Sequence, residues 1–310
     1  MITMNILDSL EPVLTQSTSV KLLDEKIKAF AHTFDESKVY HWLSICPFDL
    51  RQLTEVEKMN FLFTLDSISF SYWGTPRWTV DYSGKIYDGS KAMMICLVGA
   101  IAVGANFSPK CLANIQRSDL ENILRGSVEI PLLDERVKIL NEVGRNTQKK
   151  YGGDFRYIVD SAEGDVIRFI DIIVGTFQSF EDVSDYNRNK VFFRKRAQLL
   201  AADLNNFFGC FETVEVLTAC ADYKIPQVLR RYGILQYSDE LQKKIILRKK
   251  ILVGSMEEVE IRAHTIHAVE LIKKELNCVT SNQINDYLWL EGQKKELIDE
   301  PYHRTRTIAY

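Results

Sequence analysis

The chain has 310 residues, 46% of them hydrophobic and 26% charged, which is the composition of a globular protein with a sizeable core. Its 39 basic and 42 acidic residues leave a formal net charge of -3. This balance argues against a protein that wraps duplex nucleic acid, which needs a dense cationic surface, but it leaves room for a compact anion pocket.

Helical spacing dominates the chain. From Leu133, apolar or small residues recur at helical intervals until Gly152-Gly153 ends the pattern. Another helix is predicted from about Phe192 to Phe208, and the longest and clearest one from Met256 to Leu276. Capping-box patterns, which begin helices, occur at Thr54-x-x-Glu57, Ser118-x-x-Glu121 and Ser255-x-x-Glu258.

Strand signals are weak and short. Only Arg77 to Ile86 and Glu212 to Val216 alternate in a strand-like way. The sequence contains no repeated βα unit, no GxGxxG and no GxxxxGK[ST], which argues against a nucleotide-binding α/β sheet. We predict a mainly α protein in which residues 1–310 form a single domain, with at most a short β-hairpin near residues 74–88.

The cysteines, the first residues and the longest apolar run indicate in which cellular compartment the protein is expected. The six cysteines form no CxxC pair and no zinc spacing with His, so we expect buried thiols of a reducing compartment and no metal site. Residues 1–11 contain acids and no basic stretch, unlike a signal peptide. The longest apolar run, Ala92 to Phe107, is too short to span a membrane. A cytoplasmic location without membrane contact is expected.

One acid lies inside an otherwise apolar helical segment. Asp66 is followed by Phe70, Tyr72 and Trp73. Aromatic residues in such a run usually pack in a core. An acid among them is also what a purine-like base requires, because it accepts hydrogen bonds from the N–H edge of a guanine-type ring while the aromatic rings cover its faces. Both interpretations of this segment stay open.

The predicted helix near residues 192–208 carries polar side chains beside its apolar stripe. Arg196 and Asp203 share one side, because a step of seven residues returns to the same side of a helix. One interpretation is a buried ion pair of Asp203 with Arg196 or Lys195 that holds the helix in place. The alternative is that Lys195 and Asp203 line a pocket.

Two other charged groups fall in apolar surroundings. His303, Arg304 and Arg306 cluster within four residues and are followed by apolar ones. They are either a solvated basic tail or a docked segment that presents guanidinium groups to a phosphate. Glu260 and Arg262 alternate with apolar residues inside the longest helix, which predicts a helix with both faces partly covered.

The most informative segment is Ala221 to Pro226, which precedes a short amphipathic helix that stops at Gly233. It places the Asp222 carboxylate at the entrance of that helix, beside Tyr223 and Lys224. A helix needs no acid there for packing, whereas an enzyme that cleaves a sugar bond needs a fixed negative charge facing the reacting carbon. Asp222 is therefore a candidate for such a fixed charge.

Taken together, these segments resemble the queuosine salvage proteins, the queuosine 5′-phosphate N-glycosylases. Each motif is weak alone, but the set occurs in order over nearly the whole chain. The matching segments are Asn60-Phe61-Leu62-Phe63 with Asp66, Phe70 and Trp73; Pro131 to Gly144 with Glu135-Arg136 and Leu140-Asn141-Glu142; Lys195-Arg196-Ala197-Gln198 and Asp203; Ala221-Asp222-Tyr223 with Pro226; Val259-Glu260-Ile261-Arg262; Tyr287-Leu288-Trp289; and Pro301 with His303-Arg304.

The resemblance implies a single helical fold similar to helix-hairpin-helix DNA glycosylases. It also implies hydrolysis of the N-ribosidic bond of queuosine 5′-phosphate, which releases queuine and ribose 5-phosphate, with Asp222 as the catalytic acid. Two positions depart from the family pattern. Lys224 stands where relatives have Arg, which keeps the charge but not the bidentate geometry, and Arg194 stands where some relatives have an aromatic residue.

The hypothesis gives each candidate a role. Ionised Asp222 stabilises the oxocarbenium-like transition state or orients the attacking water. A deazaguanine base has carbon at position 7 and cannot be protonated there, so Asp66 or Glu260 is predicted to stabilise the leaving base through its other edges. No cofactor and no metal are required. The other substrate-binding candidates are Lys195, His303 and Arg306 for the 5′-phosphate; Asp203 for the ribose hydroxyls or for orienting Lys195; Tyr72, Trp73, Tyr223 and Trp289 for stacking; and Phe70 and Arg262.

Two rival functions stay open. One is a glycosylase acting on DNA or on another nucleoside, although a net charge of -3 without a long basic stripe disfavours DNA. The other is a non-catalytic helical protein that binds a nucleotide or a protein partner, against which the weakly satisfied acids Asp66, Asp203 and Asp222 argue. The expected partner is the small molecule queuosine 5′-phosphate, bound by a monomer that forms no stable nucleic-acid complex.

Overall fold

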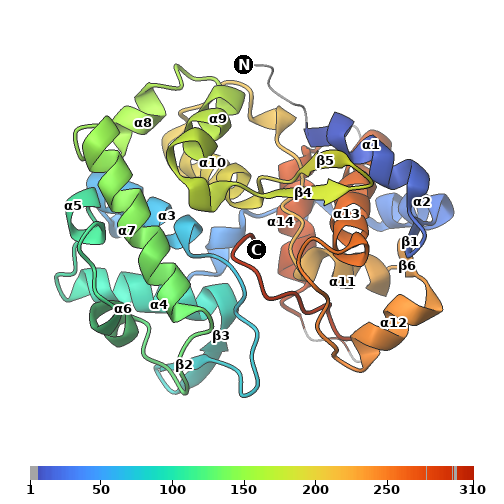
Figure 1. The fold of residues 1–310 in the computed structure, drawn as a ribbon, viewed down its shortest axis with the longest axis horizontal. Coiled ribbons are helices and arrows are strands. Elements are labelled where there is room, and N and C mark those ends of the chain that lie inside the picture. Colours follow the sequence, from blue (N-terminus) through green and yellow to red (C-terminus); the bar gives the residue numbers. More distant parts are fainter. Residues whose placement is uncertain (1–5, 277, 295, 297–298) are drawn as a thin grey trace.

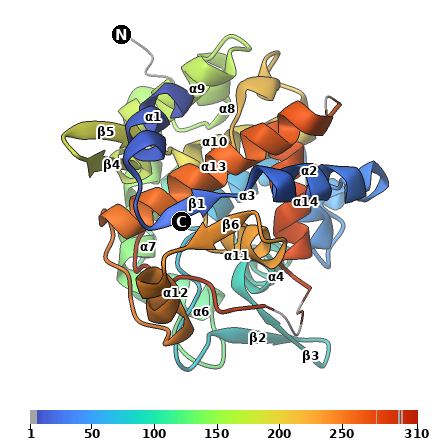
Figure 2. The ribbon, with the colours of Figure 1, turned by 90° about the vertical axis from the view of Figure 1, so that its right-hand side faces the viewer.

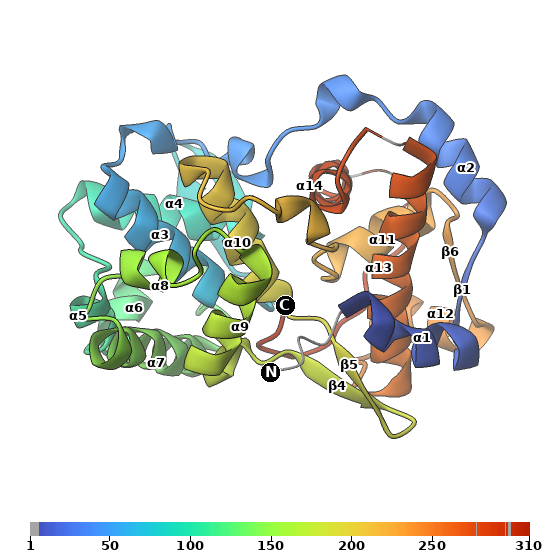
Figure 3. The same cartoon turned by 90° about the horizontal axis from the view of Figure 1, so that it is seen from above.

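The helices of the computed structural model, which describes residues 6–276, 278–294, 296 and 299–310, form two groups that face each other (Figures 1 and 3). The first group is continuous in sequence and contains α3 (Glu55–Ser67), α4 (Gly89–Ala102), α5 (Pro109–Leu112), α6 (Arg117–Ile123), α7 (Leu133–Lys150), α8 (Arg156–Asp160), α9 (Val166–Thr176) and α10 (Lys195–Phe208). The second group joins both ends of the chain and contains α1 (Ile6–Gln16), α2 (Asp24–Thr33), α11 (Lys224–Arg231), α12 (Asp239–Ile246), α13 (Met256–Leu276) and α14 (Ser281–Glu291).

Each group has its own apolar core. In the first, side chains of α3, α4, α7, α9 and α10 form one buried cluster. In the second, α13 is buried along most of its length, and α1, α2, α11 and α14 pack around it (Figure 2). The prediction of a mainly helical protein is confirmed, as are the helices Leu133–Lys150 and Met256–Leu276. No helix in the described part of the chain is both long and apolar enough to cross a bilayer.

The strands in the described part of the chain form three antiparallel pairs. The predicted hairpin is present as β2 (Thr79–Tyr82) and β3 (Lys85–Asp88). A second hairpin joins β4 (Val183–Tyr186) to β5 (Asn189–Phe192), and β1 (Val20–Leu22) pairs with the distant β6 (Leu235–Tyr237). The expectation of at most one hairpin was therefore too low. Strands of three or four residues carry too little alternation to be recognised in a sequence.

The structure differs from the prediction in one strand and in one helix boundary. The strand predicted at Glu212–Val216 is wrong, because Val214–Val216 is a 3-10 helix in which the backbone N–H groups of Val216 and Leu217 bond to carbonyls three residues earlier. Helix α10 begins at Lys195 rather than at Phe192, because residues 189–192 are paired in β5.

Gly144 allows α7 and α5 to touch. A Cβ atom at this position would lie 2.2 Å from the Ala113 nitrogen and 2.5 Å from the Pro109 carbonyl oxygen. Gly144→Ala is therefore expected to lower the free energy of unfolding by about 1–3 kcal/mol, the usual cost of overpacking. Urea denaturation measures this loss. Gly175→Ala in α9 is the matched control, since its Cβ would meet no atom within 4 Å; equal losses in both variants would refute the steric explanation.

Candidate active site

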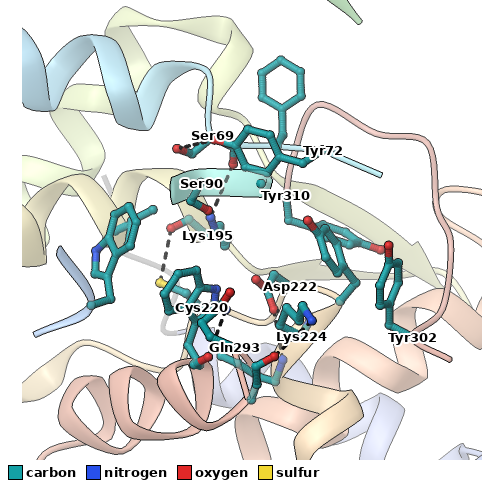
Figure 4. A pocket seen from close by; sticks show the side chains of 18 of the residues that line it. Ser69, Tyr72, Ser90, Lys195, Cys220, Asp222, Lys224, Gln293, Tyr302 and Tyr310 are labelled. Atoms are coloured by element: carbon teal, nitrogen blue, oxygen red, sulfur yellow. Dashed lines mark hydrogen bonds between the residues drawn. The ribbon is translucent and has the colours of Figure 1, made fainter. Parts of the chain in front are cut away.

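A cavity opens between the two groups of helices (Figure 4). It encloses about 1050 Å³ of empty space, its open mouth included, which suits a small-molecule ligand. The first group contributes side chains from the loop after α3, from the start of α4 and from α10, and the second contributes the entrance of α11, one face of α14 and the segment 299–310. The lining residues are Trp42, Ser69, Phe70, Tyr72, Trp73, Arg77, Asp88, Gly89, Ser90, Lys195, Leu199, Cys220, Asp222, Tyr223, Lys224, Ile225, Asn285, Asp286, Trp289, Gly292, Gln293, Tyr302 and Tyr310.

Two buried arginines fix the loop that follows α3. Arg136 of α7 donates hydrogen bonds to the carbonyls of Ile68 and Phe70, and its guanidinium lies 4.3 Å from the centre of the Phe70 ring. Arg196 of α10 donates to the carbonyls of Ser67 and Ser179. Burial lowers the pKa of both guanidinium groups to about 10, so both stay charged at neutral pH. The loop is therefore held by charge-assisted bonds, which position its aromatic side chains at the cavity.

The segment 299–310 docks against the same loop. The Ser71 hydroxyl donates to the Thr307 carbonyl at 2.6 Å, and the Thr307 N–H donates back to that hydroxyl at 3.2 Å. The backbone N–H of Ser71 also donates to the Tyr310 carbonyl at 2.9 Å. This segment is thus packed into the fold, and it brings Tyr302 and Tyr310 to the cavity. The alternative of a solvated basic tail is wrong.

Asp222 lies at the entrance of α11 and faces the cavity. Its Oδ1 accepts the backbone N–H groups of Lys224 at 2.6 Å and of Ile225 at 3.1 Å, so the acid does serve its helix, contrary to the expectation from the sequence. The side chain keeps 9% of its surface exposed at the cavity. Burial raises the pKa of Asp222, while the charge of Lys195 and the two backbone donors oppose this rise.

A network behind the cavity wall fixes the positions of Asp222 and Lys195. Arg262 of α13 makes a bidentate ion pair with Asp182, at 2.8 and 2.7 Å, and donates to the Ala221 carbonyl next to Asp222. Asp182 in turn accepts the backbone N–H of Lys195 at 3.0 Å, at the start of α10. One buried ion pair therefore ties together the segments that carry the acid and the cation.

Two more carboxyl groups lie on the far side of Lys195. Asp66 on α3 and Asp203 on α10 are both fully buried, and their carboxyl groups lie next to each other. Asp203 Oδ1 accepts the indole N–H of Trp42 at 2.8 Å. The predicted ion pair of Asp203 with Arg196 is therefore replaced by a contact with an aromatic ring of the cavity wall, because Arg196 is committed to backbone carbonyls.

The structure separates the predicted site residues into two sets. Seven of them line the cavity: Phe70, Tyr72, Trp73, Lys195, Asp222, Tyr223 and Trp289. Six lie outside this lining: Asp66, Asp203, Glu260, Arg262, His303 and Arg306. The second set is mostly buried and supports the first set or other parts of the fold.

Glu260 has structural partners of its own. Its carboxylate accepts the backbone N–H groups of Thr18 and Ser19 and the hydroxyl of Tyr186, at 2.7 to 3.3 Å. These bonds join α13 to the turn before β1 and to the β4–β5 hairpin. The predicted role of Glu260 at the leaving base does not fit this position, because the carboxylate is occupied far from the cavity lining.

His303 and Arg306, which the sequence predicted as phosphate ligands, also have other roles in the structure. Burial lowers the pKa of His303 to about 3, so the ring is neutral, and its Nε2 lies 3.2 Å from the Tyr310 hydroxyl. The Arg306 guanidinium lies 4.2 Å from the centre of the Trp73 ring. A neutral imidazole is a poor phosphate ligand, and Arg306 supports Trp73 from outside the cavity lining.

Several lining residues were missed by the sequence analysis. Asn285 and Asp286 project from α14, where the Asp286 carboxylate accepts the Trp42 backbone N–H at 3.2 Å and the Asn285 amide at 3.1 Å. Burial raises the pKa of Asp286 to about 6. Arg77 and Asp88, which form an ion pair, come from the two ends of the β2–β3 hairpin. For Asn285 and Asp286 the sequence did offer a signal, because these two polar residues directly precede the Tyr287-Leu288-Trp289 segment that carries the family resemblance.

The chemistry of this lining is that of an organic ligand site. Aromatic rings cover its walls, and its charged groups are divided between carboxylates and the cations Arg77, Lys195 and Lys224. Among the side chains that the structure describes, no group of three or more His, Cys, Asp or Glu residues is arranged to hold a metal ion.

Comparison with known proteins identifies the family. A family model described as "Queuosine salvage protein" matches residues 50–310. The chain is 41% identical over 261 residues to the queuosine 5′-phosphate N-glycosylase/hydrolase of Sphaerobacter thermophilus, covering 81% of each chain. It is 32% identical over 297 residues to the protein of that name from Mus musculus, covering 88% of each chain, and 30% identical over 306 residues to the one from Bos taurus, covering 90% of this chain and 89% of the relative. The chain therefore belongs to the queuosine salvage protein family.

Proposed function

We propose that this protein hydrolyses the N-glycosidic bond of queuosine 5′-phosphate and releases queuine. The observation that carries the proposal is the Asp222 carboxylate, fixed at a helix entrance and facing an aromatic cavity that also contains Lys195. The relatives named above are N-glycosylase/hydrolases of this nucleotide, and their similarity extends over most of both chains.

Asp222 acts on the sugar. Cleavage of the N-ribosidic bond develops positive charge on the ribose, and a carboxylate held next to the anomeric carbon stabilises that charge more than it stabilises the ground state. The carboxylate must be ionised for this role. Lys195 and the N–H groups of Lys224 and Ile225 favour the ionised form, since each opposes the rise in pKa that burial causes.

The base occupies the aromatic part of the cavity. Trp42 and Trp289 meet edge to face, with ring centres 5.4 Å apart, and Tyr72 and Trp73 come from the opposite group of helices. Asp286 takes the role that the sequence assigned to Asp66 or Glu260, because its carboxylate reaches the lining and can accept hydrogen bonds from the N–H edge or bind the amine of queuine.

The 5′-phosphate binds beside Lys224 and Arg77, and the deeper Lys195 serves Asp222. Lys224 Nζ lies 3.1 Å from the Gly292 carbonyl and 5.5 Å from the centre of the Tyr302 ring. Arg77 forms its ion pair with Asp88, which leaves the other faces of the guanidinium for a ligand. Two adjacent cations at one part of the lining match a dianionic phosphate.

The function is tested by supplying purified protein with queuosine 5′-phosphate and, separately, with queuosine, and by quantifying free queuine by mass spectrometry. Release from the phosphate, with little or none from the nucleoside, is the expected result. If neither compound yields queuine while circular dichroism shows a folded protein, the proposed reaction is wrong.

Replacing Lys224 by methionine tests the phosphate position. Because a charge-assisted hydrogen bond contributes roughly 1.5–3 kcal/mol, Lys224→Met is expected to raise KM for queuosine 5′-phosphate by about tenfold or more, with a much smaller change in kcat. Steady-state kinetics measure both. Lys190→Met, which removes an exposed lysine paired with Asp185, is the control and leaves KM unchanged. An unchanged KM in Lys224→Met would show that the phosphate binds at another place.

The proposal includes the setting of the reaction. The enzyme is a cytoplasmic monomer of one domain that acts on a free nucleotide and forms no lasting complex with nucleic acid, and its fold is related to that of helix-hairpin-helix DNA glycosylases. The nearly even balance of 39 basic and 42 acidic residues supports a small-molecule substrate over a duplex. Light scattering and a gel shift with duplex DNA at moderate salt test the oligomeric state and the absence of DNA binding.

A further inference from the structure

The contact between α3 and α10 contains two carboxyl groups that cannot both be ionised. Asp66 and Asp203 have no exposed surface. With both groups ionised, the two Asp66 oxygens and Asp203 Oδ2 face no donor among the described residues. Two adjacent negative charges in such a place repel each other and lack hydration. A single proton between them makes one of these three oxygens a donor and a second one its acceptor, which leaves one oxygen unpaired instead of three.

One end of the pair contacts the cavity wall. Asp203 Oδ1 accepts the Trp42 indole N–H at 2.8 Å and lies 3.3 Å from His41 Nε2. Trp42 lines the cavity and meets Trp289 edge to face. The hydrogen bond from Trp42 favours the negative charge on Asp203, which leaves the proton on Asp66.

The surrounding charges also favour one negative charge rather than two. Lys195 and Arg196 of α10 face the pair, and Arg196 is committed to the carbonyls of Ser67 and Ser179. Asp286 of α14 and His41 face it from the other side, and burial lowers the pKa of His41, so the imidazole is mostly neutral at physiological pH. Lys195 must serve Asp222 as well, and a fully ionised pair would draw its charge away.

We propose that Asp66 and Asp203 share one proton and, as a singly charged pair, position Trp42 in the cavity wall and leave the charge of Lys195 available to Asp222. The pair touches no substrate and is a positioning pair for the proposed reaction, on which this inference rests. It replaces the substrate-binding role that the sequence suggested for both residues. Burial and the neighbouring negative charge of Asp203 raise the pKa of Asp66 well above its usual range, so Asp66 holds the shared proton through the neutral range and loses it only at alkaline pH.

The first test measures stability and needs no substrate. A carboxyl group whose pKa is raised by folding contributes stability that is fully present below its unfolded pKa, near 4, and that is lost as the pH rises through its folded pKa. Between pH 5 and 7.5, the equilibrium constant for unfolding of the wild-type protein in urea should therefore rise about tenfold per pH unit relative to that of Asp66→Asn. In this variant an amide N–H stands in place of the proton. The exposed control Asp185→Asn should follow the wild type.

The second test measures the pH dependence of kcat/KM for queuosine 5′-phosphate. The wild-type protein should lose activity at alkaline pH, where Asp66 gives up the shared proton, and this alkaline limb should be absent or shifted upwards by a unit or more in Asp66→Asn. If Asp66→Asn does not fold, Asp203→Asn places the amide on the other member of the pair and is measured instead. If the wild type and the variant show the same pH dependence of stability and the same loss of activity at alkaline pH, the proposal of a shared proton is wrong. If the wild-type protein releases no queuine, the proposed function is wrong. The stability test still shows whether the two carboxyl groups share a proton.

Discussion

Asp222→Asn is expected to lower kcat for queuosine 5′-phosphate by about a hundredfold or more, the usual scale for removal of one electrostatic stabiliser of a transition state. The neutral amide cannot balance the positive charge that develops on the ribose. Release of queuine under single-turnover conditions measures the loss directly, because it separates the chemical step from product release.

The fold of this variant should be intact. The asparagine keeps an Oδ1 that can accept the N–H groups of Lys224 and Ile225, so the start of α11 retains its cap. The melting temperature and circular dichroism spectrum should match those of the wild type, whereas Asp222→Ala, which removes the cap, should lose about 1 kcal/mol of stability. Near-normal turnover by Asp222→Asn would refute the mechanism.

Arg262→Leu is expected to give the largest loss of stability, about 3–5 kcal/mol. Removal of the guanidinium leaves Asp182 buried and unpaired, because the bidentate ion pair at 2.8 and 2.7 Å is lost. The Ala221 carbonyl also loses its donor, so the segment that carries Asp222 is loosened. Urea denaturation at neutral pH measures the free energy of unfolding.

A surface pair provides the comparison. Arg168 is half exposed and pairs with Glu163, so Arg168→Leu should change the free energy of unfolding by less than about 1 kcal/mol. A loss of that small size in Arg262→Leu as well would mean that the buried ion pair does not hold the two groups of helices in register at the cavity.

Much of the fold is predictable because long helices have a strong period. The helix Met256–Leu276 has apolar residues at helical intervals along 21 residues and was found with its boundaries. The pairing of β1 with β6 was not found, because Val20–Leu22 and Leu235–Tyr237 are short and more than 200 residues apart. The Glu212–Val216 alternation failed for a different reason: it is a local 3-10 turn whose side chains happen to alternate.

The candidate site was predictable where a residue type is unusual for its place. Aromatic residues beside an acid pointed to Tyr72 and Trp73, whereas Asp222, an ordinary acid at a helix entrance, was singled out by the resemblance of Ala221-Asp222-Tyr223 to the family motif. The sequence could not distinguish an acid that faces the cavity from one that supports it. Asp286 and Asp66 both lie within helices next to aromatic residues, and only the packing of α14 and α3 puts the first in the lining and the second behind it.

The second group of helices has a consequence for how the protein is made. Helices α1 and α2 pack against α13, and α1 also packs against β5, so the packing of these two helices is complete only after residues 256–276 have followed. At ordinary rates of translation this interval is roughly 10–45 s. During that time, Leu10, Val13, Ile27 and Phe30, which are buried in the finished protein, lack their contacts with α13. The apolar faces of α1 and α2 must therefore be kept from non-native contacts until the later helix has been made.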